Sequence, residues 1–154
     1  MAIRNINTKI SIAGNAVTSA PNQAAYEAEA YTLIGGLSEL AEISGERGVG
    51  NVANLTSGEL EIFPTTYDPG TMEITFIADP SDSGQAALEA AYATDGAVYP
   101  FQVQFADQTD STFFSAFVTK ANETGGDSDS AVMLTVGLAR MYGVPIKGNA
   151  VTPS

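Results

Sequence analysis

The chain contains no histidine, no cysteine and no tryptophan among its 154 residues. Without histidine it has no imidazole for general-base catalysis or metal binding. Without cysteine it has no thiolate nucleophile, no disulfide and no ordinary zinc site, and the redox compartment cannot be inferred. No G-x-S-x-G turn is present to position a serine nucleophile. We therefore expect no catalytic residue, no cofactor and no metal site.

Basic residues are scarce: 6 Lys and Arg stand against 18 Asp and Glu, which gives a net charge of −12. Binding to a phosphate backbone or to an anionic membrane depends on clustered Lys and Arg, so both are disfavoured. No apolar run approaches the roughly 20 residues that span a bilayer, and the first residues lack an apolar signal core. We expect a protein made in the cytoplasm that does not bind membranes.

The length favours one domain over residues 1–154. Charged residues make up only 16% of the chain and hydrophobic residues 44%. An average globular domain has roughly 25% charged residues, so the surface of this chain depends on small and uncharged polar side chains. Such a surface loses water easily, which is typical of a protein that buries much of its outside against neighbouring subunits.

Alternating or β-branched apolar segments predict antiparallel strands, each half-buried or fully buried. They are residues 6–12, 31–34, 59–63, 71–78, 99–105, 112–119 and 131–139. One helix is predicted, from the capping-box spacing of Asp82 and Gln85 to about Ala93, before Asp95-Gly96. The pattern indicates a β-sandwich or β-barrel of antiparallel strands with one flanking α-helix.

Four segments lack a clear periodicity of apolar residues. Residues 13–30 are rich in alanine and predict an arm that needs a partner surface, a short helix starting at Asn22, or a flexible loop. Residues 36–44 are ambiguous, because Leu37, Leu40 and Ile43 recur at a helical spacing but glycines bracket the segment tightly. Residues 44–57 are rich in Gly and Asn and predict a long loop, and such loops are often binding loops. Residues 143–154 predict an extended tail with little to bury.

Three short motifs suggest chemistry, and each has a simpler interpretation. Glycines in residues 45–50 have the wrong spacing for a dinucleotide fingerprint. Asp127 and Asp129 begin like a calcium loop, but Ala131 occupies the third ligand position. Glu59 and Glu61 share one strand face, and we favour a solvated face over an acid–base pair.

Residues 68–92, with the sequence DPGTMEITFIADPSDSGQAALEAAY, resemble the tail tube (major tail) proteins of long-tailed phages. In that family a strand of this kind leads through a motif into an alanine-rich helix; the motif positions here are Asp79, Pro80, Asp82, Gly84 and Gln85. The resemblance covers about residues 31–143. Residues 13–30 and the tail after Gly143 depart from it, as does Gln108, where the family has glycine.

The resemblance implies a structural virion protein without catalytic residues. Subunits of the family form rings, typically hexamers, which stack through long loops and chain ends into a tube. Homo-oligomeric contacts, a tape measure protein inside the tube and tail completion or baseplate proteins at its ends are the implied partners. DNA passes through the lumen, and the implied location is the virion tail. An acidic wall suits such a conduit because it does not hold phosphate.

The alternation and the resemblance together give candidate residues. We expect Glu59, Glu61 and Glu73 to line the lumen, opposite apolar residues on the same strands. We expect residues 44–57 and both termini to bridge stacked rings, with these loop residues as candidates: Glu46, Arg47, Val49, Asn51 and Asn54. Asp82 and Gln85 are the candidate helix-capping residues.

Two other function classes compete with a tube subunit. One is an extracellular β-sandwich binding module such as an adhesin, which a stable monomer at high concentration would favour. The other is an enzyme that uses carboxylates with a divalent ion, which a metal-dependent shift in melting temperature would favour.

Overall fold

The computed structural model describes residues 7–40, 42–43, 45–94, 96–106 and 108–153. Residues 1–6, Ala41, Ser44, Asp95 and Ser154, which belong to segments or chain ends named above, lie outside these ranges. The described chain forms nine strands and two helices. Their bounds are β1 (Lys9–Ala13), α1 (Gln23–Ala28), β2 (Tyr31–Ile34), β3 (Leu37–Leu40), β4 (Glu46–Asn54), β5 (Glu59–Asp68), β6 (Thr71–Ile77), α2 (Ser83–Ala93), β7 (Tyr99–Gln104), β8 (Asp110–Thr124) and β9 (Met133–Asn149).

Seven strands form one antiparallel sheet in the order β2-β1-β7-β8-β9-β6-β3, and β4 and β5 form a separate hairpin. The two edge strands, β2 and β3, are joined only by Gly35 and Gly36. Two residues bridge at most about 11 Å between the strand ends, so the sheet must curl until its edges meet. The predicted antiparallel β fold is confirmed, with a second, shorter helix in addition to the predicted one.

The main core lies inside the curled sheet. Phe76, Phe101, Val136 and Leu138 are fully buried there, and α2 adds Leu88. The inward side chains of β6, Met72, Ile74 and Phe76, alternate with exposed or half-buried ones, as the sequence predicts. Phe101 and Phe114 stack with 5.6 Å between ring centroids across β7 and β8.

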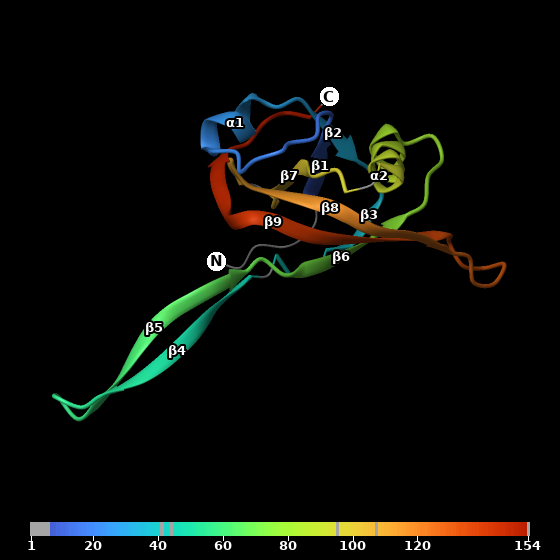
Figure 1. Ribbon diagram of the computed structural model, residues 1–154. Coiled ribbons are helices and arrows are strands. Elements are labelled where there is room, and N and C mark those ends of the chain that lie inside the picture. Colours follow the sequence, from blue (N-terminus) through green and yellow to red (C-terminus); the bar gives the residue numbers. More distant parts are fainter. Residues whose placement is uncertain (1–6, 41, 44, 95, 107, 154) are drawn as a thin grey trace.

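A second apolar cluster lies on the outer side of the sheet, beneath α1 (Figure 1). Tyr26 of α1 stacks on Phe113 of β8 with 5.6 Å between centroids, and Tyr31 packs beside them. Phe113 and Phe114 are therefore both buried, on opposite faces of β8, as predicted for this strand. Of the alternatives for residues 13–30, the short helix is the one present: Asn22 is the N-cap of α1, and the Tyr26 ring anchors the helix on the sheet.

The last residues continue the sheet. β9 runs to Asn149, and the Gln102 side chain holds Val151 by two hydrogen bonds, of 2.7 and 2.8 Å, to its backbone N–H and carbonyl. Ile146 and Val151 also pack against the cluster under α1. The segment predicted as an extended tail with little to bury is thus largely built into the fold.

Two local predictions are wrong. Residues 46–54 form strand β4, whereas the sequence predicted a loop over residues 44–57. The strand predicted at residues 59–63 is confirmed as part of β5, which is ten residues long. Every residue of β5 except Tyr67 is exposed, so the strand is not half-buried as its alternation predicted. β3, in the ambiguous segment, is a strand paired with β6. Pro69 and Gly70 join β5 to β6, with Gly70 at φ +79°.

Candidate functional site

The β4–β5 hairpin projects away from the rest of the molecule as a two-stranded ribbon (Figure 1). Residues directly opposite one another on paired strands share a face. The pairs Val49–Pro64, Asn51–Ile62 and Ala53–Leu60 therefore lie on one side. We call this side, with five apolar residues around Asn51, the apolar face of the hairpin.

The apolar face is open to solvent. Val49 is 63% exposed, Leu60 62% and Ile62 70%, and Leu55 at the tip is 96% exposed. The main core has no counterpart to this, since its apolar side chains are almost completely covered. A two-stranded hairpin alone is at best marginally stable in water. The ribbon therefore presents an apolar strip that another surface would cover.

The opposite face of the hairpin is polar toward the tip. Glu59 lies opposite Asn54, and Glu61 lies opposite Val52. The Asn54 side chain donates a hydrogen bond to Glu61 and accepts two from the turn, from the N–H groups of Thr56 and Ser57. The two lumen candidates of the hairpin thus share one face, which points away from the apolar face.

The five loop candidates lie along β4. Val49 and Asn51 belong to the apolar face, and Asn54 belongs to the polar face and ends the strand. Arg47 lies near the base, with its guanidinium carbon 5.5 Å from the centre of the Tyr67 ring, and Glu46 starts the strand opposite Asp68. These candidates are side chains of a defined strand.

Arg140 fixes the base of the hairpin, and sequence patterns gave no indication of this role. Its side chain is 4% exposed and donates to the carbonyl oxygens of Pro69 (2.8 Å) and Gly143 (3.1 Å), and it lies over the Phe114 ring. Pro69 belongs to the link between β5 and β6. A buried guanidinium therefore sets how the hairpin leaves the sheet.

Glu73 lies apart from the other two lumen candidates, on the outer face of the large sheet. It forms an ion pair with Lys120 (3.1 Å), the one ion pair among the described residues. Rows of mostly small or polar side chains surround this pair, and they cross β3, β6, β9 and β8. The members are Glu39, Thr75, Thr135 and Asn122 in one row and Thr71, Ala139 and the half-buried Phe117 in another. This face carries few charges.

The motif before α2 lies where the two sheet edges, β2 and β3, meet; we call this place the seam. Asp82 is the N-cap of α2; its carboxylate accepts from the N–H of Gln85 (2.9 Å) and from that of Gly35 (3.1 Å). The Gln85 amide donates to the carbonyls of Gly35 and Ile77, each at 2.9 Å, and accepts from the N–H of Asp79. Gln85 therefore binds the seam and Asp79, whereas a capping box would direct it to the N–H of Asp82.

Gly84 of the same motif is required by close packing. A Cβ atom at this position would lie 2.3 Å from the carbonyl oxygen of Leu33 and 2.5 Å from the Cα of Ile34. Only glycine lets the first turn of α2 approach β2 this closely. The motif residues thus attach a helix to the place where the sheet closes.

Four titrating groups have perturbed pKa values: two lie in the cluster under α1, and two lie in exposed loops. Burial raises the pKa of Tyr31 and of Tyr26, although a hydrogen bond to Ser115 opposes the shift at Tyr26. Hydrogen bonds from Ser81 lower the pKa of Asp79, and those from Ser130 and Asp129 lower the pKa of Asp127. Among the described residues, no three acidic side chains are placed to hold a metal ion.

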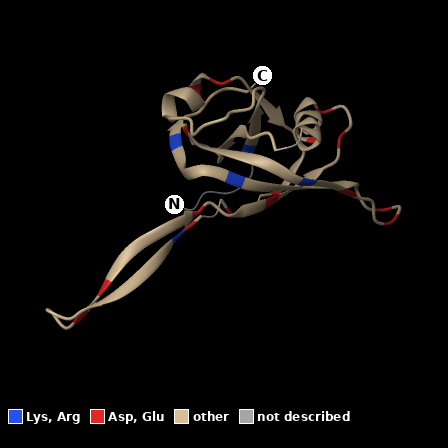
Figure 2. Ribbon diagram, in the orientation of Figure 1, with Lys and Arg blue, Asp and Glu red and all other residues tan. Residues whose placement is uncertain are grey.

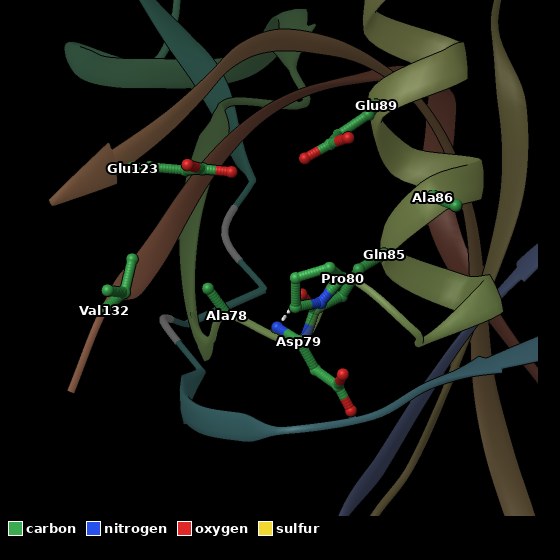
Figure 3. A pocket seen from close by; sticks show the side chains of 8 residues that line it. All are labelled: Ala78, Asp79, Pro80, Gln85, Ala86, Glu89, Glu123 and Val132. Atoms are coloured by element: carbon green, nitrogen blue, oxygen red, sulfur yellow. Dashed lines mark hydrogen bonds between the residues drawn. The ribbon is translucent and has the colours of Figure 1, made fainter. Parts of the chain in front are cut away.

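Charged residues are sparse along the strands, and acidic ones gather at the β8–β9 turn and near α2 (Figure 2). A hollow of about 340 Å³ lies at this end, between α2 and the ends of β8 and β9 (Figure 3). Its lining is Ala78, Asp79, Pro80, Gln85, Ala86, Glu89, Glu123 and Val132. No described helix has both the length and the apolar character needed to cross a membrane.

The chain matches no protein-family model and no curated protein sequence. Its fold resembles that of the SPP1 tail tube protein, with a TM-score of 0.65 at 17% identity, over 98% of this chain and 81% of that one. It also resembles a chain of the PVC sheath/tube terminator, from an extracellular contractile injection system in the extended state. That match has a TM-score of 0.68 at 9% identity and covers 96% and 97% of the two chains.

A third similar structure is the tail of an empty GTA particle refined with C6 symmetry. Its chain has a TM-score of 0.61 at 16% identity, with 94% of this chain and 98% of that chain covered. At these identities the likeness concerns the fold, and it extends over almost the whole of each chain. The protein therefore has the fold of the tail tube and injection-system tube proteins.

Proposed function

We propose that this protein is a structural subunit that assembles with copies of itself into stacked rings, which form the tube of a phage tail. The observation that carries the proposal is the apolar face of the β4–β5 hairpin, on which Val49, Leu60 and Ile62 remain mostly exposed in a single chain. A neighbouring ring is the surface that would cover it. The fold of known tube proteins supports the same assignment.

The number of subunits and the passage of DNA form the finer part of the proposal. Two structural neighbours come from six-fold assemblies, the GTA tail and the anti-feeding prophage baseplate, and we propose a hexameric ring. DNA would pass through the lumen without specific binding, past a tape measure protein. Tail completion or baseplate proteins would cap the tube in the virion tail, after synthesis in the host cytoplasm.

The two polar faces supply the proposed lumen wall. If the apolar face contacts the next ring, the opposite face with Glu59 and Glu61 is free to point into the bore. Glu73 would join them from the outer face of the large sheet, where Lys120 balances its charge. A tube reconstruction in which these three glutamates lie on the outer wall would remove this assignment.

The test is assembly of the purified protein. Concentrated wild-type chain should form rings or tubes that sediment and are visible by negative-stain microscopy. Leu60→Asp with Ile62→Asp should leave a folded, soluble chain that does not assemble, because charge on the apolar face prevents its burial. Glu59→Gln with Glu61→Gln, on the opposite face, is the matched control and should still assemble. A wild-type chain that stays monomeric at high concentration would contradict the proposal and favour a binding module.

A further inference from the structure

The turn that closes the β4–β5 hairpin holds an apolar side chain outward. The turn consists of residues 55–58, which we call the hairpin tip. The N–H of Gly58 donates to the carbonyl of Asn54 (2.8 Å), and the Asn54 side chain accepts two further hydrogen bonds from the tip. Leu55 is 96% exposed on this braced turn. Because the backbone is already ordered, burial of Leu55 against a partner would cost little further entropy.

A hollow of about 500 Å³ opens at the other end of the hairpin, beside its base; we call it the base hollow. Leu40, Ile43 and Phe105 line it, and all three are half-buried and pack against the main core. Thr112 of β8 and Lys147 of β9 are directly opposite in the strand register, so both face it. The remaining lining residues are Glu42 and Pro145. The base hollow is therefore a place where the apolar core reaches the surface.

Charge favours the base hollow over the hollow beside α2 as the partner of the hairpin tip. The tip itself is uncharged, but two glutamates of the polar face lie next to it. The base hollow is lined by one cation, Lys147, and one carboxylate, Glu42. The hollow beside α2 is lined by three carboxylates and no basic residue. The acidic end of the hairpin would therefore be repelled beside α2 and not at the base hollow.

The hairpin tip cannot enter the base hollow of its own chain. β4 has nine residues, which span roughly 30 Å at the rise of a β-strand. The hairpin projects away from the sheet over this length, so its tip and its base lie far apart (Figure 1). Only a second copy can bring the two surfaces together. A contact between different surfaces of identical chains is heterologous, and it can repeat from copy to copy.

We propose that the hairpin tip of one copy docks in the base hollow of a copy in the adjacent ring. Leu55 packs there against Leu40, Ile43 and Phe105, and it covers the apolar surface that a single chain leaves open. The apolar face of the hairpin then lies against the same neighbour. This proposal rests on the proposed function, because it names the surface that the hairpin reaches on the next ring.

The contact sets an upper limit on the spacing of the rings. The base hollow of the second copy lies at the tip of the first copy. Two successive hollows are therefore as far apart as the tip and the hollow of one chain. Leu55 lies 12 positions beyond Ile43, which is at most about 40 Å at the rise of a β-strand. Helical reconstruction of the assembled tube should give a ring spacing within this limit, and a clearly larger spacing would overturn the contact.

Cysteine cross-linking tests the contact directly, because the natural chain has no cysteine. A Thr56→Cys chain is mixed with a Glu42→Cys chain under assembly conditions and oxidised; both positions are exposed. A disulfide-linked dimer should form in this mixture and not with either chain alone. The matched control mixes Thr56→Cys with Glu89→Cys, in the hollow beside α2, and should give no dimer. Self-linked Thr56→Cys dimers, or a dimer in the control mixture alone, would overturn the proposal.

Substitution of the tip side chain tests the role of Leu55. Leu55→Ser should raise the critical concentration for assembly at least about tenfold, because an apolar side chain is no longer buried in the contact. Leu33→Ser, at an exposed leucine of β2, is the matched control and should raise it less than about twofold. Thr112→Trp should fill the base hollow and impair assembly as Leu55→Ser does. Circular dichroism should show all three variants folded.

The possible failures are distinguishable. If the wild-type chain never assembles, the proposed function falls, and the contact falls with it. If the wild-type chain assembles but Leu55→Ser behaves like Leu33→Ser, only the contact is overturned.

Discussion

The large sheet and the β4–β5 hairpin use the same alternation of apolar and polar residues but bury it differently. In β6, Ile74 is 1% exposed and lies in the core; in β5, Ile62 occupies an equivalent place in the pattern and is 70% exposed. Alternation thus specifies which side chains share a face, and the tertiary structure decides what covers that face. In the hairpin no described residue covers the apolar face, so another copy of the chain is the surface that we expect to cover it.

The largest expected effect is the difference in stability between alanine substitutions at the two isoleucines. Ile74→Ala should lower the free energy of unfolding by about 3 kcal/mol, because it leaves a cavity in a packed core. Ile62→Ala should change it by less than about 0.5 kcal/mol, because the side chain is exposed. Chemical denaturation of unassembled chains measures both. A large loss of stability from Ile62→Ala would mean that the hairpin folds back on the sheet.

An intermediate effect is the difference in stability between alanine substitutions at two side-chain amides, one at the seam and one in the hairpin. Gln85→Ala removes three hydrogen bonds at the seam and leaves their backbone donor and acceptors without this partner. The free energy of unfolding should fall by about 2 kcal/mol. Asn54→Ala removes as many bonds at the exposed hairpin turn. It should cost below about 1 kcal/mol, because water replaces them. Equal losses in thermal or urea unfolding would argue that the seam is open to solvent.

The smallest effect depends on pH and concerns the cluster under α1. Burial raises the pKa of Tyr31 above its ordinary value of 10.0, so the unfolded chain loses that proton first as the pH rises. The stabilisation is complete below pH 10 and is lost above it. Melting temperatures from pH 8 to 11 should fall more steeply for wild type than for Tyr31→Phe. Parallel curves would show that Tyr31 ionises equally in both states.

The sequence predicted most strands of the large sheet and the position of α2, because their periods are regular and their caps are local. It failed at the hairpin for an identifiable reason. Gly48 and Gly50 lower strand propensity and indicate a loop. In the structure a Cβ at Gly50 would collide with the Phe63 ring, which lies across it from the paired strand. The glycine marks a close cross-strand contact that single-strand patterns do not show.

Other functional features depend on contacts between distant parts of the chain. The Arg140 side chain reaches the carbonyl of Pro69, 71 positions away, and Tyr26 bonds Ser115 across 89. No spacing rule connects such pairs. The candidate glutamates show the same limit: alternation grouped Glu73 with Glu59 and Glu61, but they lie on separate sheets.

The two-residue link between β2 and β3 also affects the order of folding. Gly36 accepts a hydrogen bond from Ile77 of β6 (2.7 Å), and Gly35 is held by Asp82 and Gln85. Because the link is so short, neither edge strand can take its register until the opposite edge strand is nearby. Pairing of one edge strand therefore lowers the entropic cost of loop closure for the other. If either edge strand frays, the other loses its support, so β2 and β3 should gain and lose hydrogen-exchange protection together.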